Sequence, residues 1–241
     1  MSEGPAGILV IDKPIGPTSM QVCANLRWRL KQGGAPKRVK VGHAGTLDPL
    51  ASGVLVVMVG RATRLCDRVM AGEKEYVATV DLSATSATDD AEGPVTPVEG
   101  FAAPARGAVD AALAGFLGEI KQAPPAFSAV HIQGQRAYDL ARRGKIDSAS
   151  TLLGLRSVRI DEIEVESYDG PSLVVRVRCG KGVYIRSLAR DLGKALGVGG
   201  YLTGLRRTRV GRFGIAEARG MKDLPQVLTQ ADLSDIPADL A

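Results

Sequence analysis

The stretch VGHAGTLDPLASGVLVVMV, residues 41–59, joins a glycine-rich loop directly to an aliphatic run. The run at 54–59 contains no polar side chain, which is typical of a strand that is buried on both faces. The loop carries one imidazole, His43, and one carboxylate, Asp48, and Pro49 biases Asp48 away from helical backbone angles. A loop anchored by a buried strand often presents catalytic groups, but a turn at Asp48 and a packed His43 also explain the pattern.

Around this stretch, segments with two different periodicities predict an α+β fold. Residues 8–11 form a short apolar strand, while residues 76–82 and 173–179 alternate as half-buried strands do. Apolar side chains four residues apart predict one helix that Thr18 or Ser19 caps and another over residues 185–196. This mixed order of elements indicates a mixed, mostly antiparallel sheet with flanking helices.

Three other segments lack a clear periodicity. Residues 35–53 are predicted to be a loop, and the acidic residues 83–106 an exposed loop. Residues 221–241 are short, acidic and too small for a domain, which predicts a peripheral helix or a loose tail.

The composition is that of a folded protein outside the membrane. The chain has 241 residues, of which 45% are apolar and 24% charged, so one large domain or two small ones are expected. Its longest aliphatic run is too short to cross a bilayer, and no signal peptide is visible. The three cysteines are scattered singly, which argues against a disulfide framework or a zinc site and fits the cytoplasm.

The positive charge gathers in two blocks. Residues 27–68 hold nine basic side chains against two acids, and residues 176–212 hold ten against one. Residues 81–119 show the reverse, with seven acids and one base. Segregation of this kind is expected of a face that binds phosphates, although two solvated surfaces without a ligand produce the same pattern.

Six segments together resemble, in order, the motifs of the TruB family of tRNA pseudouridine synthases. The segment at 41–53 matches the family's catalytic pattern G-H-x-G-x-L-D-P-x-A-x-G in full. The other five segments are GILVIDKPIGPTS at 7–19, EKEYVATVDL at 73–82, QAPPAFSAVHIQGQRAYDLARRG at 122–144, GKGVYIRSLARDLG at 180–193 and GLRRTRVGRF at 204–213. The resemblance covers nearly the whole chain.

The resemblance implies the pseudouridine synthase fold, with a catalytic domain over residues 1–220. It also implies that residues 115–147 form an insertion that grips the T-loop of the RNA. Many members continue into a C-terminal RNA-binding domain of the PUA type. Here residues 221–241 are expected to be a tail without a PUA domain.

The implied activity is isomerisation of uridine 55 in the T-loop of tRNA, without metal or other cofactor. By resemblance Asp48 is the essential aspartate. It can attack C1′ of the ribose, remove a proton from C2′, or attack C6 of the base, and the sequence does not choose among these routes. Each route requires the ionised carboxylate, so a cation is expected beside it. A synthase for another RNA and a non-catalytic tRNA chaperone are the alternatives.

The resemblance also implies roles for other residues. Arg186 is expected to pair with Asp48, its alternative being one more phosphate contact on a basic stripe of the helix at 185–196. Tyr76 is expected to pack against the target base, and Tyr184 to line the same pocket. Ordinary core packing is the alternative for both tyrosines.

His43 is implied to act in flipping the uridine out of the stacked loop rather than as a base. Leu205 matches a pocket-lining leucine, with core packing as the alternative. The candidates for RNA phosphates are Lys13, Arg38, Lys40 and Arg64. The expected partner is the T-arm of tRNA, bound by a cytoplasmic monomer with no membrane contact and no obligatory protein partner.

Overall fold

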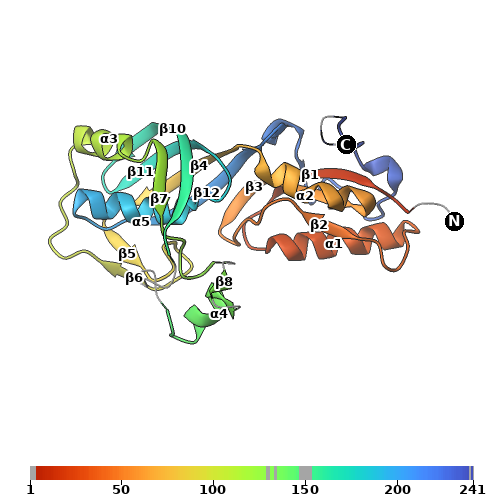
Figure 1. Cartoon of the computed structure of the whole chain (residues 1–241), viewed down its shortest axis with the longest axis horizontal. Coiled ribbons are helices and arrows are strands. Elements are labelled where there is room, and N and C mark those ends of the chain that lie inside the picture. Colours follow the sequence, from red (N-terminus) through yellow and green to blue (C-terminus); the bar gives the residue numbers. More distant parts are fainter. Residues whose placement is uncertain (1–3, 129–130, 133–134, 147–153, 239, 241) are drawn as a thin grey trace. The chain divides into compact units, whose positions relative to one another are not determined.

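The computed structural model describes residues 4–128, 131–132, 135–146, 154–238 and 240. The chain divides into two compact units, a first over residues 1–76 and 206–241 and a second over residues 77–205. Figure 1 shows strands and helices in both. Strand pairing is mostly antiparallel, with β1 and β14 parallel, so the predicted α+β class with a mixed sheet is confirmed.

In the first unit, which includes β12 from Arg206 onward, the strands are hydrogen-bonded in the order β14-β1-β3-β12, with β2 on β3 and β13 on β12. Their bounds are Gly7–Lys13 for β1, Val41–His43 for β2, Ala51–Val59 for β3, Tyr201–Val210 for β12, Phe213–Gly214 for β13 and Arg219–Gly220 for β14. The run at 54–59 is buried throughout, as predicted. The predicted loop at 35–53 was partly wrong, because β2 and the start of β3 lie within it, and β2 pairs antiparallel with the end of β3.

Helix α1 (Ser19–Gln32) begins where the sequence predicts. The Thr18 side chain accepts a hydrogen bond from the backbone of Gln21, and the Gln21 side chain accepts one from the backbone of Thr18, which forms a capping box. Gly33 ends the helix. Two short helices, η1 (Gly60–Leu65) and α2 (Cys66–Ala71), follow β3.

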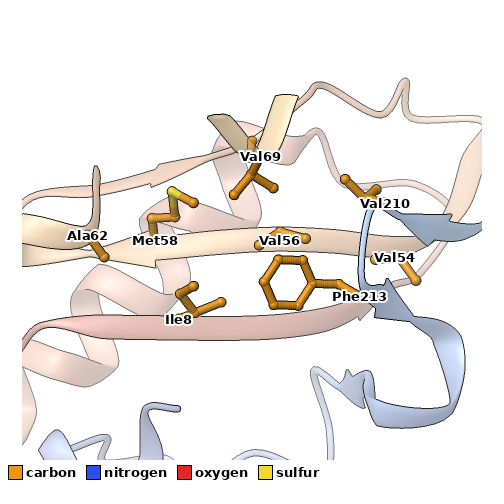
Figure 2. Packing of buried hydrophobic residues seen from close by; sticks show 9 residues of the cluster. Ile8, Val54, Val56, Met58, Ala62, Val69, Val210 and Phe213 are labelled. Atoms are coloured by element: carbon orange, nitrogen blue, oxygen red, sulfur yellow. The ribbon is translucent and has the colours of Figure 1, made fainter. Parts of the chain in front are cut away.

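The core of the first unit lies against β3 (Figure 2). Its buried members come from β1, the loop after β2, β3, the two short helices, the end of β12 and β13. They are Ile8, Ala44, Val54, Val56, Met58, Ala62, Val69, Val210 and Phe213. Burial of one such aliphatic side chain contributes about 1.5–3 kcal/mol, so this cluster is the rigid support of the loop before β3.

The segment after residue 220 is not a loose tail. Leu224, Leu228 and Leu233 are buried. The Arg29 guanidinium of α1 donates to the backbone oxygen of Leu224 at 2.9 Å, and Ile8 exchanges two backbone hydrogen bonds of 2.9 Å with Ser234. The expectation from the acidic composition was therefore wrong, because the segment's spaced leucines pack on the first unit.

In the second unit, the strand order is β4-β11-β10-β7. The bounds are Lys74–Asp81 for β4, Gly118–Gln122 for β7, Arg156–Asp169 for β10 and Ser172–Cys179 for β11, with helices α3 (Arg106–Ala114) and α5 (Ile185–Leu196). The predicted alternation of β11 is confirmed, because Leu173, Val175, Val177 and Cys179 are all buried.

The acidic segment at 83–106 is not simply an exposed loop. It contains a hairpin of β5 (Ala84–Ser86) and β6 (Val95–Pro97), and Asp89 and Asp90 between these strands are buried. Two carboxylates are buried here because arginines of α5 pair with them, as described below.

The expected insertion at 115–147 includes β7, which pairs with β10 in the sheet. The part that leaves the sheet therefore begins after Gln122. It contains β8 (His131–Ile132), β9 (Gln135–Arg136) and α4 (Ala137–Arg142), and residues 129–130, 133–134 and 147 lie outside the described residues. Across the described part of the chain, no helix is long and apolar enough to span a bilayer.

Candidate active site

The backbone around Asp48 is held from two sides. The buried Ser19 hydroxyl donates to the backbone oxygen of Leu47 at 2.9 Å and accepts from the Leu47 N–H at 2.8 Å. Beyond Asp48, the N–H of Gly16 donates to the oxygen of Pro49 at 2.9 Å. Asp48 itself is half-buried. Its carboxylate is therefore presented by a loop whose backbone is fixed on both sides.

The Arg207 side chain is hydrogen-bonded to the backbone of this loop and of β3. It is fully buried, and its Nε donates to the oxygen of Val54 at 2.8 Å. Its Nη2 donates to the oxygen of Gly45 at 3.1 Å and its Nη1 to that of Thr46 at 3.4 Å. One guanidinium thus ties the start of β3 to the residues just before Asp48.

Two glycines of the motif are required by this geometry. Gly45 and Gly53 have φ values of 104° and 99°, which other residues rarely adopt. A Cβ on Gly53 would also lie 2.2 Å from the backbone oxygen of Arg207. The glycines of the motif thus allow β12 and the loop to approach closely.

Lys13 lies behind the loop rather than on its outer surface. It is fully buried, and its Nζ donates to the oxygens of Pro14 at 2.9 Å and Pro17 at 2.8 Å. These bonds shape the turn that carries the Gly16 N–H. Lys13 was one of four predicted phosphate contacts, but its burial does not support that role.

His43 occupies the last position of β2, opposite Val57 of β3, and is half-buried. Burial lowers the pKa of His43 below its ordinary value, the Arg207 charge lowers it further, and a hydrogen bond with the Gly45 backbone acts in the opposite direction. The imidazole is therefore neutral near pH 7. A neutral ring suits stacking against a base better than it suits binding of a phosphate.

The remaining predicted site residues of the first unit are half-buried or exposed. Tyr76, on β4, is half-buried rather than a core tyrosine. Arg38 and Lys40 are exposed just before β2, and Arg64 is exposed on η1. The first unit thus contains Asp48, His43, Tyr76 and all four predicted phosphate contacts.

In the second unit, Arg186 is buried on α5, and its Nη1 lies 3.3 Å from Oδ2 of Asp90. Its Nη2 donates to the oxygen of Phe127 at 3.0 Å. One turn later, Nη1 of Arg190 donates to Oδ2 of Asp89 at 2.9 Å. These two members of the predicted basic stripe are therefore inside the unit, and only Lys194 is exposed.

The Asp89–Arg190 pair carries a desolvation cost. Burial raises the pKa of Asp89, and the nearby Arg190 and Arg186 oppose that rise. Asp191 and Asp89 together keep the pKa of Arg190 above its usual value despite burial. The guanidinium is therefore charged, and its function is to hold the acidic hairpin on α5.

Tyr184 and Leu205 complete the candidates of the second unit. Tyr184 precedes α5, and its N–H donates to Oε1 of Gln122 at 2.8 Å while its carbonyl accepts from Nε2 at 3.2 Å. Its side chain packs against a small cluster around α4, the helix that follows β9. Leu205 is half-buried on β12, so it is not an ordinary core leucine. Asp48 and Arg186 belong to different units, and their pairing stays a prediction.

Sequence reasoning did not single out Ser19 as a support of the loop, or Arg207, Asp89 and Asp90 at all. One signal for Arg207 was available. Neighbouring residues of a strand point to opposite faces, so one arginine of the Arg206–Arg207 pair had to face inward. In the part of the chain that the structure describes, no three His, Cys, Asp or Glu side chains gather so that they could hold a metal.

The site thus presents the carboxylate of Asp48 on a braced loop that is shaped by Gly45 and Gly53. Two family models match the chain: the N-terminal domain of the TruB family pseudouridylate synthases at residues 32–185, and the C-terminal domain of tRNA pseudouridylate synthase B at residues 186–236. The second match includes most of the segment expected to be a tail.

Known proteins are similar over most of the chain. The tRNA pseudouridine synthase B of Phocaeicola vulgatus is 41% identical over 229 residues, covering 95% of this chain and 96% of that protein. That of Mycobacterium tuberculosis strain H37Rv is 46% identical over 234 residues, covering 94% and 74%. This chain belongs to the TruB family of pseudouridylate synthases.

A solved structure shares the fold. A chain in the crystal structure of a Cbf5-Nop10-Gar1 complex superimposes with a TM-score of 0.68 at 34% identity, covering 90% of this chain and 53% of that one. This chain therefore spans about half the length of its solved relative. The pseudouridine synthase fold that the motifs implied is confirmed.

Proposed function

We propose that this protein converts uridine 55 in the T-loop of tRNA to pseudouridine, with Asp48 as the catalytic group. The observation that carries the proposal is the bracing of Asp48 by Ser19, Gly16 and Arg207 within the fully matched motif. A binding protein has no need for a carboxylate presented toward an RNA polyanion. An isomerase needs one in a fixed position.

The reaction breaks the bond between C1′ and N1 of the uridine, turns the uracil, and joins C1′ to C5. The hydrogen on C5 leaves as a proton and N1 gains one, so the product is an isomer of the substrate. Asp48 begins the sequence by attack at C1′, by removal of the C2′ proton, or by attack at C6. All three require the ionised carboxylate, and Arg186 is proposed to stabilise it.

The target nucleotide is proposed to leave the stacked T-loop before the chemistry, because its reacting atoms are hidden within the stack. His43, which is neutral at physiological pH, takes its place in the disrupted loop. Tyr76, Tyr184 and Leu205 line the pocket for the base. Arg38, Lys40 and Arg64 contact phosphates, the segment after Gln122 grips the T-arm, and the protein acts alone as a cytoplasmic monomer.

The test is release of tritium from tRNA labelled at C5 of uracil. The wild-type protein is expected to release tritium, and Asp48→Asn, which keeps the side-chain shape without the charge, is expected to release none while still binding tRNA. Tight binding of tRNA by the wild type with no release at all would contradict the proposal and favour a chaperone.

A further inference from the structure

Beside β2, the first unit has an open concavity of about 490 Å³. Helix α1 runs next to β2 in Figure 1 and contributes one wall. The lining residues come from α1, the loop before β2, β2 itself and η1. They are Arg27, Lys37, Arg38, Val39, Lys40, Val41, Gly42 and Thr63.

Four of these eight residues are cations and none is an acid. No ion pair joins Arg27, Lys37, Arg38 or Lys40 to an acid of the described chain. Four uncompensated positive charges around one hollow repel one another, which costs stability unless an anion binds there.

The loop that carries three of these cations is fixed at several points. The N–H of Val39 donates to the oxygen of Pro36 at 2.9 Å, and the N–H of Gly60 donates to that of Lys40 at 2.8 Å. Nη2 of Arg27 donates to the oxygen of Val41 at 2.9 Å, and Val39 is buried. The charges are therefore held on an ordered surface rather than on a mobile tail, which lowers the entropic cost of binding.

We propose that this concavity binds backbone phosphates of the RNA next to the nucleotide that enters the active site. The inference rests on the proposed function and adds Arg27 and Lys37, which the motifs did not indicate. Gly42 lines the concavity, and His43, the residue proposed to act in flipping, follows it at a rise of about 3.3 Å along β2. A phosphate bound here belongs to the stretch of RNA that surrounds the flipped uridine.

The lining favours a polynucleotide backbone over a free nucleotide. No aromatic side chain on which a base could stack is among its lining residues. Anchored phosphates on one side of the target help the backbone to rotate while the rest of the loop stays in register.

The test compares two double variants in the Asp48→Asn background, which separates binding from chemistry. Lys37→Ala with Arg38→Ala removes two charges of the concavity. The control, Arg219→Ala with Lys222→Ala, removes two exposed charges of the same unit outside it. Affinity for unmodified tRNA is measured at several salt concentrations, and melting curves check that each variant is folded.

The variant with Lys37→Ala and Arg38→Ala is expected to bind tRNA about tenfold more weakly at moderate salt. The slope of log affinity against log salt concentration is expected to be smaller in magnitude by about one to two. The control variant should have the same affinity and the same salt slope as the Asp48→Asn protein. Equal slopes for the two double variants would overturn the inference. If the wild type releases no tritium from tRNA, the proposed function fails instead, so the two failures are distinguishable.

Discussion

The two basic blocks of the sequence differ in whether the structure pairs their side chains with acids. In the block at 27–68, four cations line an open concavity without an acid. In the block at 176–212, six arginines meet carboxylates. These pairs are Arg176–Glu166, Arg178–Glu162, Arg186–Asp90, Arg190–Asp89, Arg206–Asp12 and Arg209–Glu73. A seventh, Arg207, is buried against carbonyls.

The difference shows that a count of charges along the chain does not locate a binding face. Two acids of the block at 81–119, Asp89 and Asp90, neutralise α5 from inside the second unit. No such acids reach the concavity. Both blocks are strongly basic, but most arginines of the second block pair with acids or carbonyls, whereas the four cations of the concavity have no ion pair with an acid of the described chain.

The largest effect is expected from Arg207→Met, which removes three hydrogen bonds from a charged donor and leaves three carbonyls of the first unit without them. The free energy of unfolding should fall by on the order of 4 kcal/mol. The rate constant kcat for tRNA should fall on the order of 100-fold, because Asp48 loses its fixed position. Chemical denaturation and single-turnover tritium release measure the two effects.

Arg206→Met is the matched control. Arg206 is the neighbouring residue of β12, and its half-exposed pair with Asp12 should contribute at most about 1 kcal/mol. Equal losses of stability in the two variants would show that the Arg207 contacts do not brace the loop.

A slightly smaller loss of stability is expected from Asp89→Ala, which leaves Arg190 buried with Asp191 as its only remaining acid among the described pairs. The free energy of unfolding, measured in urea, should fall by about 3 kcal/mol, which is near the lower end of the cost of removing one partner of a buried ion pair. Glu162→Ala breaks the exposed pair with Arg178 and should cost less than about 1 kcal/mol. If Asp89→Ala and Glu162→Ala lower the free energy of unfolding by the same amount, the buried pair of Asp89 with Arg190 does not stabilise the second unit as proposed.

A change of pH should show that burial, together with the Arg207 charge, lowers the pKa of His43. The chain has two histidines, so the ring signals of His43 can be assigned by nuclear magnetic resonance with His43→Asn. The signal should titrate below the ordinary value of 6.5, because burial and the Arg207 charge both disfavour the imidazolium.

The sign for stability follows from the same shift. The unfolded chain takes up the His43 proton first as pH falls, so this contribution is complete above about pH 6.5 and is lost as pH falls through the folded-state pKa. A midpoint at or above 6.5 would contradict the burial of the ring next to the Arg207 charge.

The smallest effect is expected from Arg176→Ala with Arg178→Ala, which removes two charges of the second basic block that already face Glu166 and Glu162. The salt slope of tRNA binding should differ from that of the parent by less than about 0.5, well below the change that each lost phosphate contact produces. A shift as large as that of Lys37→Ala with Arg38→Ala would show that both blocks contact RNA.

The sequence predicted those elements whose signal is local. Residues 54–59 have no polar side chain because β3 is buried on both faces, and Thr18 with Gln21 marks the start of α1 within four residues. The loop that carries Asp48 was indicated for a similar reason, because the motif that resembles the family pattern is contiguous, and its catalytic role stays a proposal.

The missed features depend on partners far away in the chain. Asp89 and Asp90 looked exposed because their arginines come about a hundred residues later, and Leu224 looked peripheral because its packing site is on the first unit. Ser19 was predicted as a possible helix cap, but Thr18 is the cap, and the Ser19 hydroxyl holds the loop 28 residues away. Burial of a polar residue against a distant partner leaves no periodic signal in the sequence.

We propose that one carboxylate, fixed on a braced loop, isomerises one uridine of tRNA. The decisive measurement is the amount of tritium released at completion from tRNA labelled at C5 of every uracil. We expect one equivalent of tritium per wild-type tRNA, none from a tRNA with cytidine in place of uridine 55, and none with Asp48→Asn. Equal release from both tRNAs, or release that survives Asp48→Asn, would show that Asp48 does not isomerise uridine 55.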